Sequence, residues 1–342
     1  MSLTDFLVNI WYSNSSKKYL FLPLTLLYRS LLAIRKILYD LGLFKKHYFP
    51  VPVVVVGNIT VGGTGKTPLV IALVGKLQQE GFKPGVVSRG YGSLAPAYPF
   101  FVDASSSVDH AGDEPYLIAV RTNVPVVIDP HRYRAVNYLI QQCNCDVIIT
   151  DDGLQHYALA RDVEIAVIDG QRQLGNGHCL PMGPLREPRS RLRSVDYTVF
   201  NGEGVTSTPT ERQSIMVLKA GDFQALDNSS CLSAGEWELS TRVHAVAGIG
   251  NPQRFYLTLR QLGFTVIEHD FSDHHKFSEK DFQFYDDLPI IMTEKDAVKA
   301  RTLNELKNCW YLPVEGHLEL EFTQSLVDRL RLLVNSKQRS YP

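Results

Sequence analysis

Apolar runs alternate with helical stretches over most of the chain beyond Pro50. The run VPVVVV at 51–56 precedes a helical pattern at 68–81, and the same alternation leads to DVIIT at 146–150. Continuous apolar strands separated by helices are typical of a parallel sheet that is covered on both faces. The pattern therefore predicts an α/β fold built on a parallel sheet.

The alternation stops at about residue 204, where Ser, Thr and isolated apolar residues replace it, and resumes at HAVAGIG, residues 244–250. It ends in a closing helix near 321–336. This change in texture predicts a larger first lobe and a smaller second one. The expected segments are an N-terminal amphipathic helix (1–48), a larger α/β core (49–203), a linker or small β excursion (204–240) and a second α/β lobe (241–342).

The first 50 residues are both basic and apolar. Seven Lys or Arg side chains stand against two Asp, a local surplus of five positive charges. Apolar positions with helical spacing begin after Pro23: Leu24, Leu27, Leu31, Ile34, Leu38 and Leu41. The apolar run at 19–28 is about half of the ~20 residues that a membrane span needs. We expect an amphipathic helix that either docks on the core of its own protein or lies in the face of an anionic membrane.

Composition narrows the class of protein. The chain has 342 residues, of which 44% are apolar and 21% charged, enough for a sizeable core. The formal net charge is −1, so no global basic field indicates a nucleic-acid partner. Five cysteines without a CxxC pair favour a reducing compartment, and the start MSLTDFLVNIW does not resemble a secretory signal.

A phosphate-binding loop follows the first apolar run. The general pattern GxxxxGK[ST] is met at 60–67 except in its first position, which is threonine: Thr60, Val61, Gly62, Gly63, Thr64, Gly65, Lys66 and Thr67. The glycines allow backbone N–H groups to turn toward a phosphate, while the lysine reaches its outer oxygens. A strand before the loop and a helix after it agree with this role. We therefore expect a P-loop NTPase-type parallel sheet, with the second, smaller α/β lobe and the N-terminal amphipathic helix added to it.

Two acids end the apolar run at 146–150. Asp151 is the expected metal-side carboxylate, with Asp152 beside it, and the Thr67 hydroxyl is the third Mg²⁺ candidate. The alternative is a strand that simply ends in an Asp-Asp-Gly turn. The acids run straight into Gly153 and Lys295 directly precedes Asp296, so the DxxG and NKxD patterns of regulatory GTPases are not met.

Three further groups are candidates for chemistry. Asp113, in HAGDEP, is either a helix cap or a general base. His274 and His275 precede a capping-box pattern, and one of them is a candidate to act on a neighbouring acid. Four arginines in GPLREPRSRLR form either a solvated helix face or a clamp for a phosphorylated substrate: Arg186, Arg189, Arg191 and Arg193.

Taken together, these motifs resemble the tetraacyldisaccharide 4'-kinase family. The resemblance rests on motifs that cover nearly the whole chain beyond the N-terminal helix: GNITVGGTGKTP (57–68), SRGYG (88–92), GDEP (112–115), DDGLQH (151–156), GNGHCLPMGPLREP (175–188), AVAGIGNPQRF (245–255), SDHHKF (272–277) and TEKDAVK (293–299). The family transfers the γ-phosphate of ATP to the 4'-hydroxyl of a tetraacylated glucosamine disaccharide 1-phosphate, a lipid A precursor. The resemblance therefore implies a lipid kinase that uses ATP and Mg²⁺ at the cytoplasmic face of the inner membrane.

The resemblance also implies residue roles. Asp113 becomes the expected base and His274 its expected partner, while Asp151 and Asp152 match the metal-side acids. Candidates on the substrate side are Arg89, His156, Arg186 and Arg189. We expect the site between the two lobes, with His274 brought in from the second lobe as they close. A membrane-associated nucleotide switch that transfers nothing is the alternative, and acceptor-dependent consumption of ATP distinguishes the two.

Overall fold

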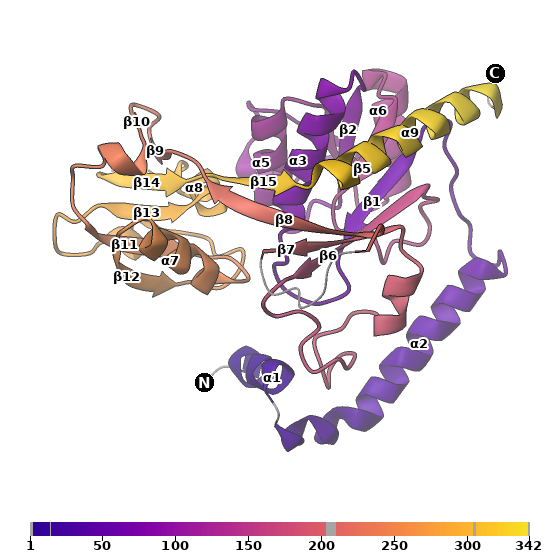
Figure 1. Cartoon of the computed structure of the whole chain (residues 1–342), viewed down its shortest axis with the longest axis horizontal. Helices are drawn as coiled ribbons and strands as arrows, with labels where there is room; N and C mark the ends of the chain where they lie inside the picture. The colour runs from indigo at the N-terminus through magenta and orange to yellow at the C-terminus, as the bar shows by residue number, and fades with distance from the viewer. Residues whose placement is uncertain (1–2, 14, 203–209, 304–305, 341–342) are drawn as a thin grey trace.

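The computed structural model describes residues 3–13, 15–202, 210–303 and 306–340 (Figure 1). Within them a nine-stranded sheet has the order β15-β8-β7-β6-β1-β5-β2-β4-β3. Its strands are β1 (Val53–Gly57), β2 (Pro84–Ser88), β3 (Phe100–Val102), β4 (Val126–Ile128), β5 (Val147–Thr150), β6 (Val163–Asp169), β7 (Tyr197–Asn201), β8 (Gln213–Ala220) and β15 (Val314–Leu318). All neighbours are parallel except β3 with β4 and β15 with β8, at the two edges. This confirms the predicted α/β class with a large parallel sheet.

Helices cover both faces of this sheet. The helices of the first lobe are α3 (Lys66–Gln79), α4 (Val108–Ala111), α5 (Asp113–Thr122), α6 (Arg132–Cys143), the 3-10 helix η2 (Arg189–Arg193) and α9 (Leu320–Ser340). One core lies between the sheet and α3, α5 and α9, and contains Leu73 and Leu326; a second lies on the α6 face and contains Leu139. Because β1 is buried at every position, its side chains are apolar on both faces rather than alternating.

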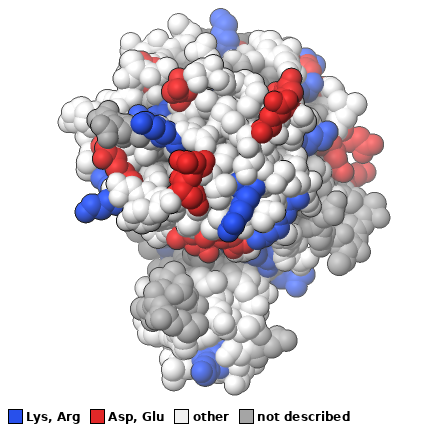
Figure 2. Space-filling model, turned by 90° about the vertical axis from the view of Figure 1, so that its left-hand side faces the viewer, with Lys and Arg blue, Asp and Glu red and all other residues white. Residues whose placement is uncertain are grey.

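The second lobe is built on a six-stranded sheet of order β10-β9-β14-β13-β11-β12. Its strands are β9 (Phe223–Ala225), β10 (Cys231–Leu232), β11 (Arg242–Ala247), β12 (Thr265–Asp270), β13 (Ile290–Thr293) and β14 (Cys309–Leu312). Its helices are α7 (Pro252–Gln261) and α8 (Glu294–Ala300), with short 3-10 turns η3 (Ala234–Glu236) and η4 (Glu279–Phe282). Both signs of charge are interspersed on the end of the molecule seen in Figure 2.

The chain passes between the two sheets more than once. Strand β8 belongs to the large sheet, while β9 and β10 belong to the small one. After β14 the chain returns: β15 pairs antiparallel with β8, and α9 buries Phe322, Leu326 and Leu330 in the large core. The sequence pattern grouped residues 314–340 with the second lobe, but these residues complete the first lobe. Because β15 pairs with β8 of the large sheet, the helix that follows it, α9, buries its apolar face on the same sheet. The exact domain boundaries stay a prediction.

The N-terminal segment lies beside the body of the molecule (Figure 1). It contains α1 (Leu3–Tyr12), η1 (Ser16–Phe21) and α2 (Leu22–Asp40), so the helix expected after Pro23 is present, while α1 was not anticipated. Most apolar residues of α2 are exposed, among them Leu27 and Leu31 at 59% and 58%. Among the described residues, no helix is long and apolar enough to cross a membrane.

Candidate functional site

The phosphate loop joins β1 to α3. Gly62 and Gly65 have φ angles of +91° and +93°, which L side chains rarely adopt. The buried Asn58 amide donates to Gly62 O and Thr64 Oγ1, both at 3.2 Å, and these two hydrogen bonds stabilise the conformation of the loop. Since α3 begins at Lys66, its first N–H groups face the loop, as an anion site requires.

The first two residues of the phosphate-loop pattern, Thr60 and Val61, pair with the backbone of the GPLREP segment. Thr60 forms a β-bridge with Leu185, and Val61 N donates to Pro184 O at 2.9 Å. Both therefore hold the phosphate loop against the GPLREP segment. The threonine in the first position thus lies where a backbone pairing, rather than a glycine φ angle, is needed.

The two acids after β5 lie next to the phosphate-loop lysine. Asp152 Oδ1 is 3.7 Å from Lys66 Nζ, and Arg186 Nη1 donates to the Asp152 carboxylate at 3.0 Å. Asp151 is buried, and its Oδ1 has no hydrogen-bond partner within the described chain. Burial and then the Glu114 charge raise the pKa of Asp151. A buried, unpartnered carboxylate oxygen beside a phosphate loop fits a Mg²⁺ ligand, because Mg²⁺ takes oxygen donors of this kind.

The structure brings Asp113 and His274 together from different lobes. Asp113 is the first residue of α5, with Gly112 at the capping position, and is 7% exposed. His274 Nδ1 donates to its carboxylate at 3.0 Å. Burial raises the pKa of Asp113, but the His274 hydrogen bond and the Lys295 charge outweigh it and lower the value to about 2. The same hydrogen bond raises the pKa of His274.

The neighbouring histidine has another partner. His275 Nε2 lies 3.4 Å from Asp281, in the capping box at η4. His274 has a φ angle of +62°, and the two neighbouring imidazoles bind different carboxylates. His274, not His275, therefore pairs with Asp113.

A cavity of about 430 Å³ lies between the lobes at this site. The first lobe contributes Lys66, Thr67 and Glu114 to its lining, and the second lobe contributes Asn251, Arg254 and Lys295. The lobes meet closely at its edge, because a Cβ placed on Gly250 would lie 2.4 Å from Gly63 N. The phosphate loop thus faces the second lobe directly.

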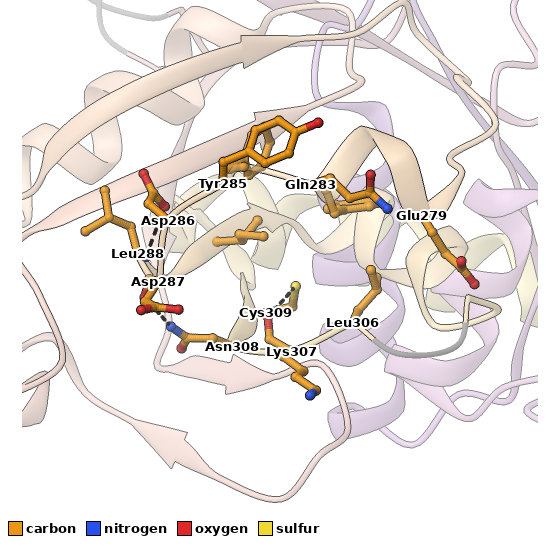
Figure 3. Close-up of a pocket in the computed structure, with 13 residues that line it drawn as sticks. Glu279, Gln283, Tyr285, Asp286, Asp287, Leu288, Leu306, Lys307, Asn308 and Cys309 are labelled. Carbon is orange, nitrogen blue, oxygen red and sulfur yellow. Dashed lines mark hydrogen bonds between the residues drawn. The ribbon is translucent and has the colours of Figure 1, made fainter.

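A larger cavity, of about 500 Å³, lies elsewhere in the second lobe (Figure 3). Asp286, Leu288, Lys307 and Asn308 surround it, at the amino ends of β13 and β14. The cavity with the phosphate loop instead contains Thr293 and Leu312, at the carboxyl ends of the same strands. Ligands of open α/β sheets bind at the carboxyl ends, so we assign the site to the smaller cavity.

The arginines of GPLREPRSRLR separate in the structure. Arg186 binds Asp152, as described above, whereas Arg191 is buried and pairs with Glu164 and Glu187. Arg189 is exposed, like Arg193. The run is therefore not one clamp, because Arg186 precedes η2 and binds Asp152, whereas within η2 the guanidinium of Arg191 is buried against two acids.

His156 lies among several basic side chains. Burial, followed by the charges of Arg132, Arg161, Arg35 and Arg89, lowers its pKa to about 3. Arg132 Nη2 also donates to the backbone oxygens of Asp151 and Asp152. Arg132 was not identified from the sequence, since HRYRAV carries no recognisable pattern. A basic region thus adjoins the two acids on the side of α2.

Two further residues at the site, Glu114 and Lys295, lie within the sequence motifs, although the sequence did not indicate a role for them. Glu114 follows the candidate base, and Lys295 of α8 donates to Glu114 Oε1 at 2.9 Å. Only their place in GDEP and TEKDAVK could have drawn attention to them.

Comparisons with known proteins agree with this geometry. Residues 17–331 match the family model LpxK, tetraacyldisaccharide-1-P 4'-kinase. The tetraacyldisaccharide 4'-kinases of Nitrosococcus oceani and Hahella chejuensis are 43% and 45% identical to this chain, cover 98% and 96% of it, and are themselves covered over 97%. The crystal structure of LpxK from Aquifex aeolicus in complex with ATP superposes with a TM-score of 0.78 at 29% identity, over 93% of this chain and 99% of that one.

Proposed function

The chain belongs to the tetraacyldisaccharide-1-P 4'-kinase family, and from that premise we propose how its residues perform the reaction. It is an ATP-dependent kinase that phosphorylates the 4'-position of tetraacyldisaccharide 1-phosphate in lipid A biosynthesis. The observation that carries the proposed mechanism is the Asp113–His274 hydrogen bond, formed across the lobes beside the phosphate loop.

The phosphate loop binds and orients the donor. Amides of the loop and of the first turn of α3 face the phosphates of ATP, and Lys66 neutralises the charge that develops on the transferred group. Thr67, Asp151 and Asp152 would hold Mg²⁺, and the ion would supply further neutralisation of the phosphate charge. Positioning and charge are the main requirements of phosphoryl transfer, so these groups provide most of the rate enhancement.

Asp113 acts as the general base. Its carboxylate accepts the proton of the 4'-hydroxyl while the hydroxyl oxygen forms the new bond to the γ-phosphorus and the bond to the leaving ADP oxygen breaks. The low pKa of Asp113 keeps it ionised before transfer, and His274 stabilises that charge and holds the carboxylate in one orientation. Closure of the lobes excludes water that would otherwise accept the phosphate.

The lipid acceptor approaches from the side of α2. The Tyr28 hydroxyl in α2 donates to Arg186 O at 2.8 Å, which links this helix to the segment beside Asp152. Arg186, which binds Asp152, and His156 and Arg89, which lie in the basic region beside the acids, bind the polar part of the substrate, and the exposed Arg189 adds a further donor from the same segment as Arg186. The basic, apolar N-terminal segment lies in an anionic membrane surface, at the cytoplasmic face of the inner membrane.

The decisive assay measures acceptor-dependent phosphorylation. Purified protein with Mg-ATP and tetraacyldisaccharide 1-phosphate should yield a lipid that carries one more phosphate, detected by mass spectrometry. The Asp113→Asn variant should bind ATP and form almost no product. Full turnover by this variant would contradict the role of Asp113, whereas ATP hydrolysis without lipid product would favour a nucleotide switch.

A further inference from the structure

One lysine connects both halves of the proposed catalytic pair. Lys295, in α8 of the second lobe, has a side chain that is only 14% exposed. Its ammonium lies 2.9 Å from Glu114 and 3.7 Å from Asp113 on α5, and 3.1 Å from Asp273, the residue before His274. It thus contacts the helix that carries the base and the loop that carries its histidine.

The carboxylates around Asp113 require a positive charge such as the Lys295 ammonium nearby. Three carboxylates meet at this point, and they would repel one another in a partly buried space without a cation between them. The other basic group of α8, Lys299, lies 2.9 Å from Asp296 and so already has a carboxylate partner. His274 donates a hydrogen bond to Asp113, but it belongs to the opposite lobe. Its loop is held in place by Lys295, which donates to Asp273.

We propose that Lys295 is a positioning residue for phosphoryl transfer: it holds the His274 loop against the amino end of α5, so that the Asp113–His274 hydrogen bond forms in the closed site. This inference rests on the proposed role of Asp113 as base. The Lys295 ammonium therefore influences the reaction through the Asp113–His274 pair and does not itself accept a proton.

The Lys295 charge lowers the pKa of Asp113 and also that of His274. Among the described residues, the charged groups that face the pair are Glu114 on α5, Asp273 in the loop, and Lys295 and Lys299 on α8, and the Tyr91 ring lies 5.2 Å from the His274 ring. Removing Lys295 leaves an excess of negative charge, so both pKa values rise. Because Asp113 must be ionised to accept the proton, the acidic limb of the rate profile then moves to higher pH.

The test compares kcat against pH for wild type, Lys295→Met and Lys295→Arg, with tetraacyldisaccharide 1-phosphate and Mg-ATP. Lys295→Met should lower kcat at pH 7 by about 10-fold or more and move the acidic limb up by about 1–3 pH units. Lys295→Arg keeps the charge and should restore the position of the limb. The Kd for ATP, measured by titration, should stay close to that of wild type.

A matched control separates this role from simple docking of the lobes. Arg121 on α5 donates to Glu294 on α8 at 2.8 Å, and so forms another ion pair between the same two helices without reaching Asp113. Arg121→Met should leave the pH profile unchanged. If it shifts the limb as Lys295→Met does, the lysine only docks the lobes and the inference is wrong.

Two further outcomes are also decisive. If Lys295→Met only raises KM for ATP and leaves the profile in place, Lys295 contacts the nucleotide and the inference fails. The Asp113→Asn variant distinguishes this failure from failure of the proposed mechanism, since full activity of that variant would show that Asp113 is not the base. An inactive Asp113→Asn with an unshifted Lys295→Met profile would contradict the lysine's role alone.

Discussion

His274 Nδ1 lies 3.0 Å from Asp113 Oδ2, although the two residues are 161 positions apart and belong to different lobes. The pair forms only when the loop after β12 reaches the amino end of α5. Each lobe therefore carries half of the proposed proton-accepting group. Catalysis by this pair requires the lobes to be together, which couples closure to chemistry.

Asp113→Asn should lower kcat by about 100-fold to 10,000-fold, because an amide accepts no proton at neutral pH. The Kd for ATP should change little, since the side-chain partners described for Asp113 are His274 and Lys295, outside the phosphate loop. Single-turnover kinetics with the lipid acceptor measure the first effect, and nucleotide titration measures the second. Asp109→Asn, at an exposed acid in α4, is the control and should behave as wild type. A loss of ATP affinity without loss of kcat would assign Asp113 to nucleotide binding.

Lys66→Ala should reduce lipid phosphorylation by about 100-fold to 1,000-fold, because it removes a preorganised charge on the transferred group. The fold should persist, as the lysine stands at the start of α3 and its ammonium faces Asp152 rather than the core. Lys76→Ala removes a lysine of the same helix that pairs with Glu80, and it should retain turnover. Circular dichroism checks that both variants are folded. Near-normal turnover by Lys66→Ala would contradict the phosphate-loop assignment.

Gly250→Ala should raise KM for ATP. The new Cβ would lie 2.4 Å from Gly63 N, a backbone atom, so the second lobe must move away from the phosphate loop. Overpacking of this kind costs about 1–3 kcal/mol, equivalent to about 5-fold to 150-fold in affinity. Gly235→Ala, where a Cβ meets nothing within 4 Å, is the control in the same lobe. Equal KM values for the two variants would show that the lobes need not meet for ATP to bind.

Substitution of serine for Leu27, Leu31 and Ile34 together should weaken binding to vesicles that contain anionic lipid. Each of these side chains is more than half exposed on α2, and burial of such a side chain contributes about 1.5–3 kcal/mol. Leu332→Ser, at a still more exposed leucine on α9, should leave vesicle binding unchanged. Co-sedimentation measures the bound fraction. These substitutions are preferable to deletion of the N-terminal segment, because Thr25 and Ile10 are buried.

His274→Gln should reduce stability in a pH-dependent manner. The Asp113 hydrogen bond raises the pKa of His274 in the folded state. Its contribution is therefore complete below the unfolded value of about 6.5 and is lost as pH rises through the folded value. Asp113, with a pKa of about 2, stays ionised over this range. Urea unfolding of wild type and variant should differ more at about pH 5.5 than at pH 9; a constant difference would mean that the imidazolium form does not matter.

Features formed by neighbouring residues could be predicted from the sequence. The phosphate loop is contiguous, so its glycines, Lys66 and the flanking strand and helix were identified together. The parallel sheet followed from apolar runs such as β1, whose burial on both faces leaves no alternation. The helix after Pro23 followed from its spacing. In each case the physical cause acts within a few residues of the chain.

Features that depend on distant contacts were decided by the tertiary structure. Three features of the site depend on which elements pack together. They are the pairing of Asp113 with His274 rather than His275, the separate environments of Arg186 and Arg191, and the three carboxylates around Lys295. The return of β15 and α9 to the first sheet has the same cause. The sequence determined which groups are available for phosphoryl transfer, and the packing of the lobes decided which of them meet, because hydrogen bonds and ion pairs act only over a few ångströms.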